Sequence, residues 1–154
     1  ADWPGRWQRL MVGGRPLILD ASHNPEGAQV LEENLRRLEL DTGRRPVVIV
    51  GALGASRAAP LLATIARHAR EIHLAVPQQA RACSHEELRA LIPREFTGRI
   101  VDATIAALFP TPDTCTAGEA SDTLVVTGSI YLVGEVMARL QPERGANEGR
   151  LQDF

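Results

Sequence analysis

Short apolar runs alternate along this chain with segments in which apolar residues recur every three or four positions. A short apolar run bounded by turn residues is typical of a buried strand, and the longer spacing is typical of a helix with one apolar face. The runs predict strands at residues 7–12, 16–20, 46–53, 71–76, 98–101 and 122–127. The spacing predicts helices at residues 25–38, 59–69, 84–91, 104–120 and 130–140.

This alternation of strands and helices indicates an α/β fold. Consecutive strands that are joined by helices form parallel sheets, and right-handed crossovers cover both faces of such a sheet. We therefore expect a Rossmann-like three-layer sandwich with a mostly parallel sheet of about six strands. In such sheets, ligands bind beyond the carboxyl ends of the strands.

The length of the chain, 154 residues, is enough for one domain with a real core, expected over residues 1–140. Residues 141–154 are polar and lack an apolar period, so this segment is predicted to be a disordered tail. The first residues do not resemble a signal peptide, and the chain reads as a piece of a longer protein.

The composition of the chain limits the kinds of molecule that it is expected to bind. The formal net charge of −2 gives no reason to expect nucleic acid, and no apolar run approaches the roughly 20 residues that span a bilayer. Cys83 and Cys115 lie far apart and show no metal-ligand spacing, so we expect reduced thiols and a cytoplasmic protein. All 17 basic residues are arginine, so chemistry that needs a lysine must come from outside this chain.

A cluster of polar residues stands where the predicted strand at 16–20 ends and the next helix begins. Asn24 is a favoured N-cap and Pro25 suits the first helical position, and the helix start offers free amides and positive potential to an anion. His23 can donate to phosphate oxygens, and Asp20 can accept from ribose hydroxyls or hold a metal-bound water. Capping alone explains Asn24, whereas a plain cap needs neither Asp20 nor His23, so we favour a functional role for that pair.

Two further loops and one arginine are expected at the same edge. The loop 51–60 contains two glycines that permit close backbone approach to a ligand. Ser129 can cap the helix at 130–140 and hold a carboxylate, and Arg81 can reach the edge from the next loop. No phosphate-gripping glycine loop is present, and no metal site is expected. Three histidines are scattered without metal-ligand spacing: His68, His73 and His85.

Five segments occur in an order that resembles a known family. They are WPGR at 3–6, LILDASHNPEGA at 17–28, VVIVGAL at 47–53, RA at 81–82 and LVVTGSIYLVGEV at 124–136. Together they resemble the C-terminal domain of folylpolyglutamate synthase and its dihydrofolate synthase relatives, within the Mur ligase superfamily. The resemblance covers about residues 2–140. The Asn-Pro after His23, with the Thr-Gly-Ser-x-Tyr-Leu motif, points to the folate branch rather than to the peptidoglycan ligases.

The resemblance implies a reaction and a set of partners. ATP with Mg²⁺ would phosphorylate a carboxylate of folate or dihydropteroate, and the amine of L-glutamate would attack the acyl phosphate. The family's N-terminal ATPase domain carries the phosphate-gripping loop, the metal ligands and much of the pterin site. This chain would close over ATP, help to hold glutamate, be inactive alone and belong to a monomeric enzyme.

Site residues follow from the resemblance position by position. The residues implied to bind ATP are Arg6, Asp20, His23 and Asn24. The residues implied to lie near glutamate or an acidic substrate group are Ser129 and Arg81. No catalytic residue and no metal ligand is carried over to this chain.

One departure from the family pattern concerns the loop after VVIVGAL. The family usually has Asp-Lys-Asp there, whereas this chain has Gly54, Ala55, Ser56 and Arg57. Arg57 is the candidate replacement for the lysine, although guanidinium and ammonium groups are not interchangeable in a tight site. Two alternatives therefore stay open: a non-catalytic nucleotide-binding regulatory module, and the C-terminal domain of a peptidoglycan Mur ligase.

Overall fold

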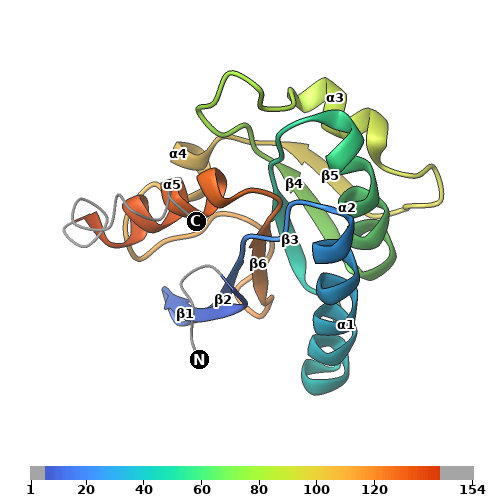
Figure 1. Ribbon diagram of the computed structural model, residues 1–154. Coiled ribbons are helices and arrows are strands. Elements are labelled where there is room, and N and C mark those ends of the chain that lie inside the picture. Colours follow the sequence, from blue (N-terminus) through green and yellow to red (C-terminus); the bar gives the residue numbers. More distant parts are fainter. Residues whose placement is uncertain (1–5, 143–154) are drawn as a thin grey trace.

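A computed structural model describes residues 6–142 as a six-stranded sheet with helices on both faces (Figure 1). The strands are β1 (Gln8–Val12), β2 (Arg15–Asp20), β3 (Val47–Val50), β4 (Glu71–Leu74), β5 (Arg99–Asp102) and β6 (Leu124–Thr127). The helices are α1 (Pro25–Thr42), α2 (Ala55–His68), α3 (His85–Leu91), α4 (Ile105–Leu108) and α5 (Ile130–Leu140). The strand order is β1-β2-β6-β3-β4-β5, and only the β1–β2 pair is antiparallel. The predicted α/β sandwich is confirmed.

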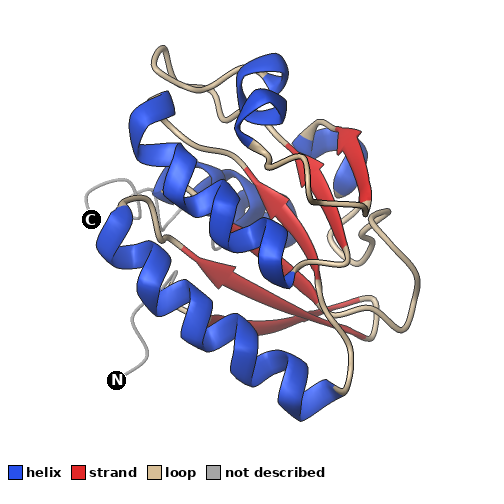
Figure 2. Ribbon diagram, turned by 90° about the vertical axis from the view of Figure 1, so that its right-hand side faces the viewer, coloured by secondary structure: helices blue, strands red, loops and turns tan. Residues whose placement is uncertain are grey.

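The order of the strands explains why the helices divide between the two faces. From β2 the chain moves through α1, α2 and α3 toward β5, and from β5 it returns to the middle of the sheet, where β6 lies between β2 and β3. Right-handed crossovers that run in opposite directions leave their helices on opposite faces. Figure 2 shows long helices lying across one face of the sheet, and α5 lies on the other face in Figure 1.

Each face of the sheet has its own core. Along β3, Val48 and Val50 pack with the buried residues of α1, α2 and α3, whereas Val47 and Ile49 pack with those of α4 and α5. Strands β3 and β6 are buried along their whole length. The continuous apolar runs at these positions are what a strand with two covered faces requires.

Three helices deviate from the predicted boundaries, and one prediction is wrong. Helix α1 continues past Leu38 to a left-handed Gly43, and α2 begins earlier than predicted. The segment 104–120 is not a helix, because α4 ends after four residues and an irregular loop follows. Pro110 and Pro112 cannot donate the amide bonds of a helix, and Gly118 adopts a left-handed conformation there.

Some predictions lie outside the described residues. These are the motif residues 1–5, including Trp3, and the tail residues 143–154. None of the helices within residues 6–142 combines the length and the apolar character that a bilayer span requires. Within that range, both cysteines are free thiols.

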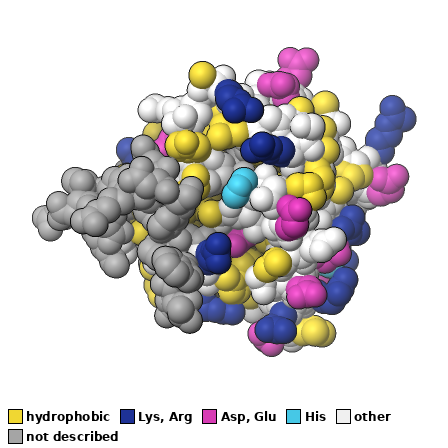
Figure 3. All heavy atoms as spheres, in the orientation of Figure 1, with side chains coloured by type: hydrophobic (Ala, Val, Ile, Leu, Met, Phe, Trp, Pro, Cys, Tyr) yellow, Lys and Arg dark blue, Asp and Glu magenta, His cyan; other side chains and the backbone are white. Residues whose placement is uncertain are grey.

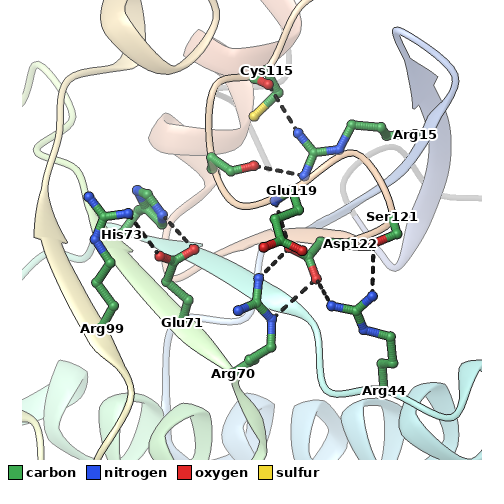
Figure 4. Close-up of polar contacts among 11 residues, drawn as sticks. Arg15, Arg44, Arg70, Glu71, His73, Arg99, Cys115, Glu119, Ser121 and Asp122 are labelled. Carbon is green, nitrogen blue, oxygen red and sulfur yellow. Dashed lines mark hydrogen bonds and ion pairs between the residues drawn. The ribbon is translucent and has the colours of Figure 1, made fainter.

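A buried aspartate and its ion pairs hold together the edge of the sheet at which the parallel strands begin, here called the amino edge (Figure 4). Asp122, 1% exposed, precedes β6 and forms ion pairs with Arg44, at 3.0 Å, and with Arg70. It also accepts a 2.7 Å hydrogen bond from the Glu119 amide. Burial alone would raise the pKa of Asp122, but the bonds from Arg70 and the Glu119 amide and the charges of both arginines outweigh it and hold the pKa below its usual range. The start of β6 is thereby tied to the segments that enter β3 and β4.

Replacing Asp122 by asparagine is expected to lower the free energy of unfolding by about 2 kcal/mol near pH 7, because charge-assisted hydrogen bonds are lost. A carboxylate whose pKa is lowered by folding stabilises fully above about pH 4, and loses this contribution as the pH falls through its folded-state pKa. Urea unfolding at pH 7 and pH 3 measures the difference between the two proteins, which should shrink at the lower pH.

Asp102→Asn is the matched control. Asp102 pairs with Arg89 at 2.9 Å, but both side chains are nearly half exposed. An exposed pair of this kind contributes about 0.5 kcal/mol or less. Equal losses of stability in the two variants would show that the buried ion pairs of Asp122 stabilise the fold no more than an exposed pair does.

Candidate functional site

A cleft of about 950 Å³ opens beyond the carboxyl ends of β2, β6 and β3. The loop after β2 leads into α1 on one face, and the loop after β6 leads into α5 on the other, so the two loops part at this edge. Such a divergence between neighbouring strands is where open α/β sheets bind ligands. The face shown in Figure 3 carries arginine and apolar side chains around a histidine.

The start of α1 forms one wall of the cleft. Asn24 caps the helix, because its Oδ1 accepts a 2.8 Å hydrogen bond from the Gly27 amide. His23 is exposed, and its Nδ1 lies 3.0 Å from the Ala21 carbonyl oxygen. A carbonyl can only accept, so Nδ1 carries the hydrogen and Nε2 is the nitrogen left for a ligand.

The start of α5 forms the opposite wall. Ser129, 2% exposed, caps this helix by accepting a 3.0 Å hydrogen bond from the Tyr131 amide. The preceding Gly128 has φ +112°, and a Cβ there would approach the Gly51 carbonyl to less than 3.0 Å. A glycine is therefore required where the loops after β6 and β3 meet, and Gly128 lines the cleft.

Asp20 lies at the base of the cleft, at the end of β2. It is only 7% exposed, and burial raises the pKa of its carboxyl group. Hydrogen bonds from Ser22, from the Trp7 backbone and from Thr127 partly oppose this rise. The Thr127 hydroxyl donates at 3.4 Å, from the neighbouring strand β6.

Most of the site residues expected from the sequence meet in this cleft. They are Arg6, Asp20, His23, Asn24, Arg57 and Ser129. Arg6 arrives from the segment before β1, and Arg57 from the first turn of α2. Arg81 is exposed and does not line the cleft, although its carbonyl accepts a 3.2 Å hydrogen bond from the Gly54 amide beside it.

The cleft has an apolar wall that was not predicted from the sequence. Trp7, Val30 and Tyr131 are not among the site residues expected from the sequence. All three line the cleft, together with Leu53 and Ile130. The signal available in the sequence was the position of Val30 off the apolar stripe of α1, where the structure leaves it 56% exposed.

The other histidines lie away from this cleft. His68 bonds Glu32 at 2.9 Å, and His85 bonds the Ala103 carbonyl at 2.8 Å. His73 is buried beside Glu71, and its burial lowers the pKa of the ring. Among residues 6–142, no group of three or more histidine, cysteine or acidic side chains is placed to hold a metal ion.

The arrangement suits a large, mostly anionic ligand. Two guanidinium groups, an imidazole and the starts of two helices offer donors and positive potential, whereas the aromatic and aliphatic wall offers a surface for a planar group. The described residues of the cleft contain no thiol and no lysine that could act as a nucleophile. The cleft of this α/β domain therefore offers groups that can bind and orient such a ligand.

Several solved structures have a fold similar to that of this chain over most of its length. The bifunctional folylpolyglutamate synthase/dihydrofolate synthase of Yersinia pestis, solved with AMPPNP and a Mn ion, is 26% identical over 91% of this chain and 32% of its own, with a TM-score of 0.71. A bifunctional enzyme of the same name, solved with Mn, AMPPNP and L-glutamate, is 27% identical over the same shares, with a TM-score of 0.70.

A third structure extends this likeness in fold. The folylpolyglutamate synthase of Mycobacterium tuberculosis, solved with ADP and AMPPCP, is 23% identical over 92% of this chain and 33% of its own, with a TM-score of 0.70. No protein-family model and no curated protein sequence matches the chain. The chain thus spans about a third of the folylpolyglutamate synthases that it resembles, and it has the fold of one part of them.

Replacing Gly128 by alanine is expected to lower the free energy of unfolding by about 2 kcal/mol or more, because its backbone is strained for any other residue and the Gly51 carbonyl blocks a Cβ. Gly134→Ala is the control, because this glycine lies inside α5 with open space around it. It should raise stability by about 0.5–1 kcal/mol. Urea unfolding compares the two, and a tolerated Gly128→Ala would contradict the close approach.

Proposed function

We propose that this chain is the C-terminal domain of an ATP-dependent ligase that adds L-glutamate to folate or dihydropteroate through an acyl-phosphate intermediate. The observation that carries the proposal is the meeting of Arg6, His23 and the starts of two helices in one cleft. The likeness in fold to synthases solved with nucleotide analogues supports it.

The proposed roles follow from the chemistry of each side chain. Arg6 suits the phosphate oxygens of ATP, because its planar fork donates two parallel hydrogen bonds and keeps its charge at any physiological pH. His23 donates from Nε2 when it is protonated. Asn24 holds the start of α1 in shape, and Asp20 belongs to the same nucleotide half of the cleft.

The amino-acid half of the cleft is proposed to lie toward α5 and α2. Ser129 and the amides that follow it face an incoming glutamate, and Arg57 supplies the positive charge for a carboxylate. Arg57 lines the cleft, which supports its part as the replacement for the family's lysine. A contact of Arg81 with an acidic substrate group stays a prediction, since this side chain lies outside the cleft.

The metal ion and the phosphate-gripping loop are proposed to belong to an N-terminal ATPase domain of the same polypeptide. The described residues provide no cluster of metal ligands, whereas their cationic groups suit the phosphates to which Mg²⁺ would bind. Mg²⁺ would neutralise phosphate charge during transfer. We also propose that the whole enzyme is monomeric and works in the cytoplasm.

A non-catalytic nucleotide-binding module is the second candidate. The observation in its favour is the loop at Gly54–Arg57, which lacks the Asp-Lys-Asp of the synthases. A peptidoglycan ligase domain is disfavoured by the Asn-Pro that follows His23. A full-length parent that joins glutamate to dihydropteroate or tetrahydrofolate would decide for the folate ligase.

Arg6→Ala and His23→Ala are each expected to weaken binding of AMPPNP to the 154-residue chain by about tenfold, because each removes a hydrogen bond to a charged group. Isothermal titration at pH 6.5 and low salt measures the affinity. Arg9→Ala is the control, because Arg9 is exposed on β1 and does not line the cleft. If all three variants bind alike, Arg6 and His23 do not form the nucleotide site.

The 154-residue chain alone is expected to release no ADP when it is incubated with Mg·ATP, L-glutamate and either dihydropteroate or tetrahydrofolate. Its sequence contains no phosphate-gripping loop to align the transferred phosphoryl group. A coupled assay for ADP measures turnover. Substrate-dependent release of ADP by this chain would contradict the division of roles between two domains.

A further inference from the structure

Glu71 and His73 form a buried polar pair that the proposed function does not use (Figure 4). Each residue is 5% exposed, and Nε2 of His73 lies 3.3 Å from Oε2 of Glu71. This contact lacks the geometry of a hydrogen bond, and no described residue hydrogen bonds to either ring nitrogen or to Oε2. Polar atoms that are buried without partners destabilise a fold, so this pair requires an explanation.

The pair faces the side of the sheet that carries α4 and α5. Successive residues of a strand point to opposite faces, and the neighbours of His73 along β4 pack in the core on the α1 side. Ile49, the partner of His73 in β3, packs with Phe109 and Ala117. Helix α5 lies mainly over β2 and β6. The cover over this part of β4 is therefore residues 103–121, here called the cover segment.

Two arginines tie the cover segment to the neighbouring elements. Arg139 of α5 donates to the Phe109 carbonyl at 2.8 Å, and Arg15 donates to the carbonyls of Cys115, at 3.0 Å, and Ala117, at 2.7 Å. After α4 the cover segment contains no helix or strand. Segments of this kind open locally at a small fraction of the free energy of unfolding. The cover segment can therefore open while the sheet stays intact.

The closed structure has no place for a second proton on the His73 ring. A neutral imidazole carries one N–H, which Nε2 can direct toward Glu71, whereas a protonated ring carries two. No described residue offers an acceptor to Nδ1. Protonation would thus add a buried charge and a buried donor without a partner, and both would gain water if the cover segment opened.

The charged groups around the ring do not offset this cost. Strand β5 contributes Arg99, whose Nη1 lies 3.4 Å from Glu71 and competes with the ring for that carboxylate. Strand β3 is entirely apolar, and α4 contains no titratable residue. The cover segment contains Asp113, Glu119 and the thiol of Cys115, and none of them forms an ion pair with the ring. Burial lowers the pKa of the ring, and the neighbouring carboxylate only partly opposes this.

We propose that the Glu71–His73 pair is an acid-sensitive switch: the ring is neutral while the cover segment is closed, and a proton added to the ring opens that segment. Neither residue of the pair lines the cleft, so this inference does not depend on the proposed function. A histidine that is neutral in the folded chain stabilises fully above its unfolded-state pKa of about 6.5. That contribution is lost as the pH falls toward the lower folded-state pKa.

The first test measures urea unfolding at pH 7.5 and pH 5.5 for the unaltered chain, His73→Gln and His85→Gln. If the folded ring stays neutral, His73 raises the unfolding constant by up to about tenfold between these pH values. His73→Gln should lose this share of the pH dependence. His85→Gln is the control and should keep it, because His85 is less buried and its Nε2 bonds the Ala103 carbonyl at 2.8 Å. Equal pH dependence in the unaltered chain and His73→Gln would overturn the proposal.

The second test uses the unaltered chain and NMR, so it holds even if His73→Gln does not fold. The His73 ring should titrate at a lower pH in the folded chain than in urea. The Thr116 amide, which donates to the Leu108 carbonyl at 2.9 Å, reports on the cover segment. It should be less protected from hydrogen exchange than the amides of β6, and its protection factor should fall between pH 7.5 and pH 5.5. A ring that titrates as in urea, or a Thr116 protection factor that does not change, would contradict the switch.

Discussion

The insertion of β6 between β2 and β3 is the constraint on which the rest of this structure depends. Parallel hydrogen bonding on both sides of β6 brings the end of β2 beside the ends of β6 and β3. The chain then leaves β2 toward one face and β6 toward the other. No side chain creates the cleft; the order of the strands creates it, and the side chains only give it chemistry.

Two buried aspartates show how the two ends of the sheet differ. Burial pushes the pKa of both carboxyl groups upward. Around Asp122 two arginines reverse that effect, so ionisation there supports the fold. The groups that lower the pKa of Asp20 are all neutral, so its pKa stays raised and ionisation of this carboxyl group destabilises the fold. The amino edge is thus organised for stability, and the carboxyl edge keeps polar groups that stability alone would not select.

The sequence predicts the fold well, because strands such as β3 and helices such as α5 carry patterns that only one environment satisfies. It also predicts which loops meet, because parallel strands end at one edge, so Asp20, Ser129 and Arg57 could be expected there. The prediction of a helix over 104–120 was wrong because alanine and leucine favour a helix locally, whereas Pro110 and Pro112 prevent the helix from continuing.

Such patterns predict neither the direction of a side chain nor an unusual backbone conformation. The distance of Arg81 from the cleft depends on how its loop turns, which no spacing reveals. The left-handed Trp7 directly precedes β1, in a setting that exists only because β1 pairs with β2. Tyr131 looked like an ordinary core residue because its position in α5 is compatible with either role.

The contact between Gly128 and Gly51 has a consequence for how this protein can change. At that point a Cβ would meet the Gly51 carbonyl oxygen, so any residue other than glycine is strained there. A descendant of this sequence could alter its ligand preference through Val30, Arg57 or Tyr131 on the sides. Position 128 could change only with a loss of stability, because the constraint on it comes from the main chain of the neighbouring loop rather than from side chains.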